Sequence, residues 1–153
     1  MSLLEALSPE FVICRFHATS KKHVLERLAD LAEEKCGTPA RDILDAVIKR
    51  EKLGSTGIGA GFAIPHALVN GITSDMVMIA TLAEPVTFDS HDQKPVDVIC
   101  MVLGPNGCTS SHVSTVAMAS QLLKHSGADM RKAKTIDALL ARIEMKTENS
   151  AAA

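Results

Sequence analysis

Two long apolar runs in the second half of the chain constrain its fold more than any other feature. The first is Met76–Leu82 and the second is Val96–Leu103, and each contains at most one or two polar residues. A strand with one face in water alternates apolar and polar side chains, whereas a nearly continuous apolar strand is typical of a sheet covered on both faces. We therefore expect helices to pack on both sides of a sheet built around these two runs.

Amphipathic segments elsewhere in the chain supply those helices. Apolar residues recur at helical spacing in four segments: 21–35, 38–52, 112–124 and 136–145. In the second segment Pro39 is predicted at the first helical position, where a missing amide proton costs nothing. The β-rich run Phe11–Phe16 predicts a further strand. The pattern predicts the α/β class, as a single domain with a mixed β-sheet flanked by helices on both faces.

Composition limits where such a domain works and what it binds. With 153 residues, 46% of them hydrophobic, the chain is long enough to bury a core. We expect one domain over residues 1–147 and a disordered tail at 148–153. A net charge of −2 argues against a nucleic-acid partner. The sequence shows neither a signal-peptide pattern nor an apolar run of membrane-spanning length, and its four cysteines form no C-x-x-C pair. We therefore expect no membrane insertion and a cytoplasmic location.

A glycine-rich stretch precedes a proline and a histidine in the middle of the chain. Four glycines lie between Gly54 and Gly61, and Ala63-Ile64-Pro65-His66 follows. Glycine lets backbone amides face another molecule closely, while Pro65 fixes its own φ and pushes Ile64 towards an extended conformation. The pattern predicts that His66 stands at the end of a short strand, aimed at a partner rather than buried.

Several familiar motifs do not explain this stretch. The spacing of the glycines differs from that of a dinucleotide-binding fingerprint, and Pro65 lies where the helix of that motif would have to continue. A Walker A loop is also excluded, because its Gly-Lys-Ser/Thr ending is missing. The sequence contains no Cys/His cluster of the kind that binds a metal ion, and it lacks the G-x-S-x-G motif of serine hydrolases. Two alternatives stay open at this point: a glycine-rich hairpin with an incidental His66, and a cysteine hydrolase built on Cys108 and His112.

Phosphoryl transfer asks for groups that this sequence does contain. It needs a nucleophile, donors around the phosphoryl oxygens and nearby positive charge. The imidazoles of His66 and His112 both lie at the ends of elements beside buried strands, and an imidazole is available as a neutral nucleophile near pH 7. Arg50 offers a planar fork of donors, while the hydroxyls of Ser55 and Thr56 add further donors. No cofactor or metal is needed for this chemistry.

At these residues the sequence resembles a known family. The run Arg50–Gly59 together with Ala63-Ile64-Pro65-His66 is similar to the active-site signature of enzyme IIA domains of the phosphotransferase system, of the mannitol/fructose type, and most of all to their nitrogen-regulatory branch. The likeness extends over nearly the whole chain, including the turn at Asp89–Val96 and the helix that carries His112. The resemblance implies a mixed sheet flanked by helices, in agreement with the fold expected from the pattern alone.

The resemblance also implies a role for each matching residue. His66 would accept a phosphoryl group on Nε2 from the phosphohistidine of an HPr-like phosphocarrier protein, with His112 supporting the phosphate and the active ring. Arg50 would lie near the site, and Ser55 and Thr56 would line it and help to position the phosphate.

The resemblance implies a phosphotransferase that serves as a regulatory, nitrogen-related phosphocarrier acting on a downstream target protein. One alternative is a sugar-transport IIA component that passes phosphate to a separate IIB. An alternative of another class is a regulatory binding module without phosphoryl transfer. One departure is visible: Leu68 stands where many relatives carry a basic residue, which bears on docking of the carrier.

Overall fold

The computed structural model describes residues 12–143, so the tail predicted at 148–153 and the domain boundary predicted at 147 lie outside the described residues. Along the chain the elements are β1 (Val12–Phe16), α2 (Lys21–Cys36), α3 (Ala40–Leu53), β2 (Gly57–Gly59), β3 (Phe62–Ala63), β4 (His66–Val69), β5 (Met76–Val86), β6 (Val96–Pro105) and α4 (Thr109–Lys132). Residues 136–143 are also helical. Among the described helices, none is long and apolar enough to cross a membrane.

The described strands form one six-stranded mixed sheet, which confirms the predicted fold class. Its order is β1-β5-β6-β3-β2, and β4 also pairs with β6. The central pair, β5 and β6, is antiparallel and places Met78 opposite Met101. Strand β1 runs parallel to β5, strands β3 and β4 run parallel to β6, and β2 is antiparallel to β3. The two apolar runs of the sequence are thus the two strands at the centre of the sheet.

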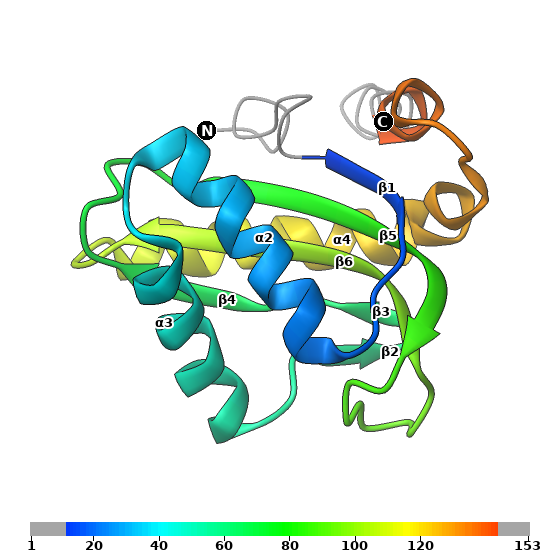
Figure 1. Cartoon of the computed structure of the whole chain (residues 1–153), viewed down its shortest axis with the longest axis horizontal. Coiled ribbons are helices and arrows are strands. Elements are labelled where there is room, and N and C mark those ends of the chain that lie inside the picture. Colours follow the sequence, from blue (N-terminus) through cyan, green and yellow to red (C-terminus); the bar gives the residue numbers. More distant parts are fainter. Residues whose placement is uncertain (1–11, 144–153) are drawn as a thin grey trace.

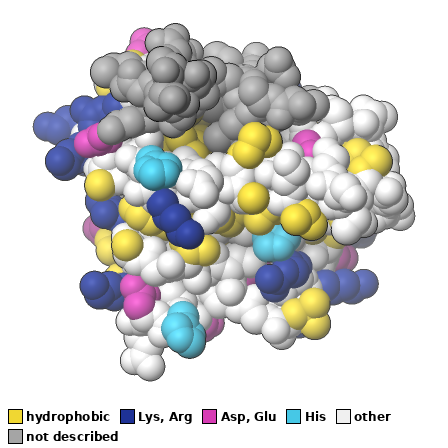
Figure 2. Space-filling view, turned by 180° about the vertical axis from the view of Figure 1, so that it is seen from behind, with side chains coloured by type: hydrophobic (Ala, Val, Ile, Leu, Met, Phe, Trp, Pro, Cys, Tyr) yellow, Lys and Arg dark blue, Asp and Glu magenta, His cyan; other side chains and the backbone are white. Residues whose placement is uncertain are grey.

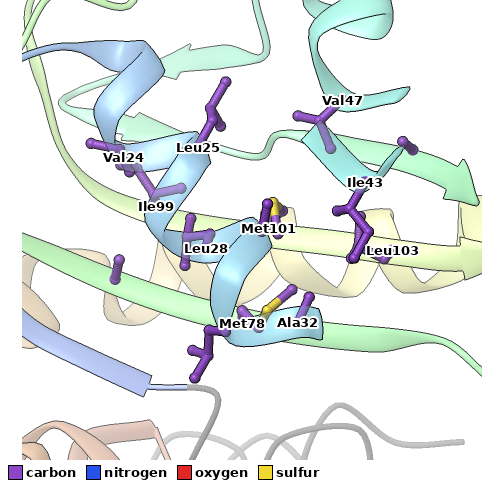
Figure 3. Close-up of a cluster of buried hydrophobic side chains, with 14 of the residues drawn as sticks. Val24, Leu25, Leu28, Ala32, Ile43, Val47, Met78, Ile99, Met101 and Leu103 are labelled. Atoms are coloured by element: carbon purple, nitrogen blue, oxygen red, sulfur yellow. The ribbon is translucent and has the colours of Figure 1, made fainter. Parts of the chain in front are cut away.

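Alternate side chains of these central strands pack into two separate cores. Met78 and Met101 join the first core, beneath α2 and α3, as Figure 3 shows. Ile79 and Cys100 join the second core, which Leu123 of α4 completes from the other face. Figure 1 shows the same layering, with α2 and α3 in front of the sheet and α4 behind it. Helices cover both faces, as the uninterrupted apolar pattern predicted.

The strand that carries His66 differs from the sequence-based prediction. His66 was expected at the end of a strand, but β3 ends at Ala63 and His66 opens a second strand, β4. Both strands pair with β6 in the same register, Ala63 opposite Ile99 and His66 opposite Val102. Pro65 interrupts the strand because it has no amide proton, yet its carbonyl still accepts a hydrogen bond from Val102 N at 2.9 Å. The chain therefore stays beside β6, and His66 is anchored more firmly than predicted.

Two helix boundaries were also predicted wrongly. Pro39 is the N-cap of α3, one residue before the first helical position. The helix expected at 112–124 runs from Thr109 to Lys132, because Gly127 packs directly against the ring of Phe62. A Cβ at Gly127 would lie 2.5 Å from Phe62 Cζ, so the close helix–strand contact outweighs the weak helical propensity of glycine.

Candidate functional site

Three of the predicted site residues meet at one end of β4. His66 opens β4, His112 lies in the first turn of α4, and Arg50 lies in the last turn of α3. The two imidazole centroids are 5.6 Å apart, with the rings inclined by 51°. Arg50 Nε lies 3.2 Å from His66 Nε2. The three side chains line one open groove, together with Leu53 and Leu68.

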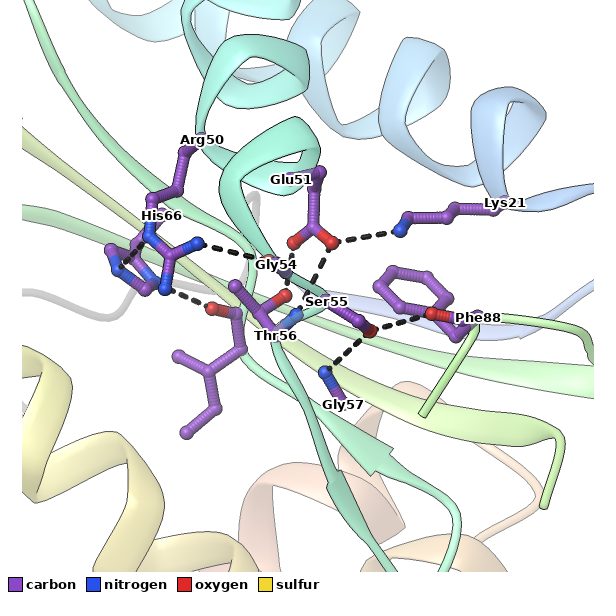
Figure 4. Close-up of polar contacts among 10 residues, drawn as sticks. Lys21, Arg50, Glu51, Gly54, Ser55, Thr56, Gly57, His66 and Phe88 are labelled. Carbon is purple, nitrogen blue, oxygen red and sulfur yellow. Dashed lines mark hydrogen bonds and ion pairs between the residues drawn. The ribbon is translucent and has the colours of Figure 1, made fainter. Parts of the chain in front are cut away.

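The end of α3 aims Arg50 at this groove. The helix stops at Leu53, and the amide of Gly54 closes it by donating to the carbonyl of Glu51 at 3.1 Å. The carbonyl of Gly54 then accepts a hydrogen bond from Arg50 Nη1 at 2.9 Å. With Nη1 fixed by the chain reversal, Nε of the same guanidinium donates to His66, as Figure 4 shows. Gly54, the first glycine of the glycine-rich stretch, thus helps to orient the arginine.

The hydrogen bonds of His66 define its tautomer. Its Nδ1 lies 2.7 Å from the carbonyl oxygen of Ile64. A carbonyl oxygen only accepts, so Nδ1 carries the proton and Nε2 carries the lone pair, which accepts from Arg50 Nε. His66 is half-buried and Nε2 is directed at the guanidinium. The ring is therefore held as a neutral nucleophile whose reactive nitrogen is Nε2, the nitrogen that the family resemblance implies.

His112 has a different environment. It is buried, with 7% of its surface exposed, and its amide donates to the carbonyl of Cys108 at 3.1 Å. Burial lowers the pKa of His112, the nearby His66 lowers it further, and the carboxylate of Asp75 opposes both by raising it. Before any phosphate arrives, these effects favour the neutral ring.

Asp75 is a buried residue beside this site that the sequence reasoning missed. Its side chain, in the loop before β5, is 6% exposed. Its Oδ2 accepts hydrogen bonds from Ser111 Oγ at 2.7 Å and from Thr115 Oγ1 at 2.6 Å. The signal available in the sequence was an acidic residue directly before an almost wholly apolar strand, where a carboxylate needs partners.

The hydroxyls of Ser55 and Thr56 bond to other groups than His66. Ser55 Oγ donates to the carbonyl of Phe88 at 2.6 Å and accepts from the amide of Gly57 at 3.1 Å. Thr56 bonds to the carboxylate of Glu51 through both its amide and its hydroxyl. Figure 4 shows these side chains pointing towards Phe88 and Glu51, while His66 lies on the other side of Gly54. In this state both residues fix the glycine-rich loop, and their predicted contact with phosphate stays a prediction.

The surroundings of the groove mix apolar and charged side chains. Leu53, at the end of α3, is 85% exposed, and Val113, next to His112, is 61% exposed. On the face seen in Figure 2, Lys and Arg side chains stand in separate small groups among apolar ones. Within residues 12–143, no group of three or more His, Cys, Asp or Glu side chains is arranged to hold a metal ion. Cys108 lies at the N-cap of α4 with its thiol exposed.

Comparisons with known proteins agree on one family. The model of the family described as "Phosphoenolpyruvate-dependent sugar phosphotransferase system, EIIA 2" matches residues 5–146. The nitrogen regulatory protein of Bradyrhizobium diazoefficiens is 33% identical over 124 residues, which cover 81% of both chains.

A second relative and a solved structure extend these matches. The fructose-specific EIIA component of the phosphotransferase system from Haloferax volcanii is 35% identical over 107 residues, covering 69% of this chain and 70% of that protein. The crystal structure of nitrogen regulatory protein IIA-Ntr from Neisseria meningitidis superposes with a TM-score of 0.85 at 29% identity. That match covers 93% of this chain and 99% of the Neisseria protein.

Proposed function

We propose a function from one premise: this chain belongs to the EIIA 2 family of the phosphoenolpyruvate-dependent sugar phosphotransferase system. As an enzyme IIA of that system it is a phosphotransferase. On this premise we infer that His66 accepts a phosphoryl group on Nε2 from the phosphohistidine of an HPr-like carrier. The observation that carries the proposal is the double hydrogen bonding of His66, with Nδ1 on the carbonyl of Ile64 and Nε2 facing Arg50.

The transfer step uses groups already in place. The lone pair on His66 Nε2 attacks the phosphorus, a new N–P bond forms, and the N–P bond of the donor breaks, returning its electron pair to the donor imidazole. The ring of His66 keeps its Nδ1 proton and becomes positively charged. The carbonyl of Ile64, 2.7 Å from Nδ1, stabilises that charge as it develops.

Arg50 and His112 would then contact the phosphoryl oxygens. Arg50 Nε gives up its bond to Nε2 when the phosphorus approaches, and its fork of donors turns to the incoming oxygens without leaving the groove. His112, whose ring centroid is 5.6 Å from that of His66, lies close enough to donate from another side. Ser55 and Thr56 help to position the phosphate through the loop they hold, by their bonds to Phe88 and Glu51.

Two uses of the phosphorylated protein remain candidates. The nitrogen regulatory proteins of Bradyrhizobium and Neisseria favour a regulatory role, in which phosphorylation of His66 alters binding to a downstream target. The fructose-specific EIIA component from Haloferax favours transport, in which His66 passes its phosphoryl group to a separate IIB protein. Incubation of the phosphorylated protein with a purified fructose-type IIB distinguishes the regulatory role from the transport role. Loss of the phosphoryl group to IIB is expected only for the transport role.

The primary experiment is intact-mass analysis after incubation with phosphoenolpyruvate, enzyme I and an HPr-like carrier. We expect a gain of about 80 Da, the mass of one phosphoryl group. The variant His66→Ala is expected to gain nothing, whereas His91→Ala, in which an exposed histidine away from the groove is removed, should gain it fully. A full gain of mass in His66→Ala would overturn the assignment.

A further inference from the structure

Two buried polar side chains, Asp75 and His112, lie beside one glycine of the central sheet. Gly104, in β6, lies between them: a Cβ built on it would be 2.8 Å from Asp75 Oδ1 and 2.9 Å from His112 Nδ1. The two atoms thus converge on one point beside the glycine. Both are fully enclosed, and among the described residues neither has a hydrogen-bond partner. A buried carboxylate oxygen and a buried ring nitrogen that lie beside the same glycine, both without a partner, are suited to pair with each other.

The helix that carries His112 also holds the carboxylate. Ser111 and Thr115 lie on either side of His112 in the sequence, and their hydroxyls both bond to Asp75 Oδ2. An ionised carboxylate only accepts hydrogen bonds, and each of its two oxygens can accept them. Oδ2 is therefore engaged while Oδ1 keeps its capacity to accept, on the side where His112 Nδ1 lies. Any shift of α4 carries His112 and the partners of Asp75 together.

We propose that Asp75 is a positioning residue for the transfer reaction. Its carboxylate accepts a hydrogen bond from Nδ1–H of His112, which leaves Nε2 of that ring to contact the phosphoryl group on His66. This inference rests on the proposed function of His66. Once Nδ1–H points at a carboxylate, the remaining nitrogen is the one available to the groove that His66 and Arg50 line.

The arrangement also lets His112 gain a proton when the phosphoryl group arrives. The titratable and charged groups around the ring and its groove are Asp75 before β5, His66 on β4, and a set on α3: Asp42, Asp45, Lys49, Arg50 and Lys52. A phosphoryl dianion on His66 adds negative charge on the groove side of a ring that already has a carboxylate on its buried side. The imidazolium is then favoured, and its Nε2–H donates to a phosphoryl oxygen while its Nδ1–H stays on Asp75.

The decisive measurement is nitrogen-15 NMR of the histidine rings in the unphosphorylated full chain. We expect the neutral ring of wild-type His112 to carry its single proton on Nδ1. Asp75→Asn keeps the shape and the ability to accept but removes the charge, so the midpoint of the His112 titration should move to lower pH. Asp89→Asn is the matched control, because Asp89 is exposed and has φ of 55°, a conformation that asparagine adopts readily.

The rate of phosphorylation by the carrier provides a second test of the role of Asp75. We expect Asp75→Asn to slow phosphorylation by the carrier roughly tenfold, as for other carboxylates that orient a working histidine, with His66 still reaching full occupancy. Gly104→Ala places a methyl group between Asp75 Oδ1 and His112 Nδ1 while both side chains stay present. It should shift the nitrogen-15 signals of His112 in the same direction as Asp75→Asn does.

The outcomes separate this inference from the phosphocarrier proposal. A wild-type His112 with its neutral proton on Nε2, or one whose tautomer and titration do not change in Asp75→Asn, overturns the role of Asp75 even if phosphorylation is normal. Because the ring spectra are recorded without phosphate, a protein that the carrier fails to phosphorylate would overturn the function of His66 and still leave the Asp75–His112 pair tested on its own. If Asp75→Asn does not fold, the wild-type tautomer decides.

Discussion

The two histidines of the site differ in what holds them. The ring of His66 is half-buried and bonded at both nitrogens, to a backbone carbonyl and to Arg50. The ring of His112 is buried against Asp75 and Gly104, and its pKa is lowered. In the first arrangement the two bonds leave the lone pair of the reactive nitrogen on Nε2. The second makes a ring whose charge responds to the groups that approach it from the groove. Under the proposed function, His66 is the residue that reacts and His112 is the residue whose charge changes in response.

Replacing Arg50 should have the largest effect after the loss of His66 itself. Arg50→Ala removes both the donor to Nε2 and the fork for the phosphoryl oxygens, so we expect phosphorylation to slow by about a hundredfold to a thousandfold. Arg50→Lys keeps the charge without the planar fork and should recover only part of the rate. Rapid-quench mixing with the phosphorylated carrier measures both. A wild-type rate in Arg50→Ala would show that the bond to Nε2 has no part in transfer.

Removing His112 should slow the reaction without stopping it. In His112→Ala the nucleophile, its tautomer and Arg50 all remain, so we expect roughly a tenfold to hundredfold loss in rate and full occupancy of His66 at long times. His125→Ala, which removes an exposed histidine at a distant position of α4, is the control. If His112→Ala stays unphosphorylated after prolonged incubation, the two rings share the reacting role and the distinction drawn between them fails.

The pH dependence of the free energy of unfolding should reveal the lowered pKa of His112. Because burial lowers the pKa of His112 in the folded state, the unfolded chain binds the proton more tightly, and the free energy of unfolding should fall as pH drops below about 6.5. His112→Gln removes this proton uptake, so its stability should depend less on pH in that window. Urea unfolding at several pH values from about 7.5 downwards, with His17→Gln as an exposed control, compares the slopes. Equal slopes for wild type and His112→Gln would contradict the pKa direction.

What sequence reasoning could reach follows from which signals are local. Apolar runs predicted the covered sheet, and the glycine–proline–histidine order together with a family signature predicted His66, His112 and Arg50. The carboxylate of Asp75 was missed because its partners lie 36 and 40 residues further along, on α4. The length of α4 was missed for the same reason, since the contact of Gly127 with Phe62 that sustains it is non-local. Local patterns and the family signature singled out His66 as the proposed reacting ring, and only the fold revealed the carboxylate beside His112.

The smallest effect should come from the rim of the groove, where the two histidines again differ. Leu68 follows His66 by two positions on β4, so its side chain lies on the same face of the strand and lines the groove. Leu68→Lys adds a positive charge beside the reacting ring. We expect the apparent KM for an HPr-like carrier to change a few-fold, with little change in kcat and a stronger dependence on salt, because rim charges act mainly on the encounter of two proteins. Val113→Lys adds the same charge beside His112 at a position 61% exposed, and is expected to change KM less. An equal change in both variants would mean that the carrier approaches both rings alike, whereas a larger change at Leu68 locates its docking on the side of the ring that reacts.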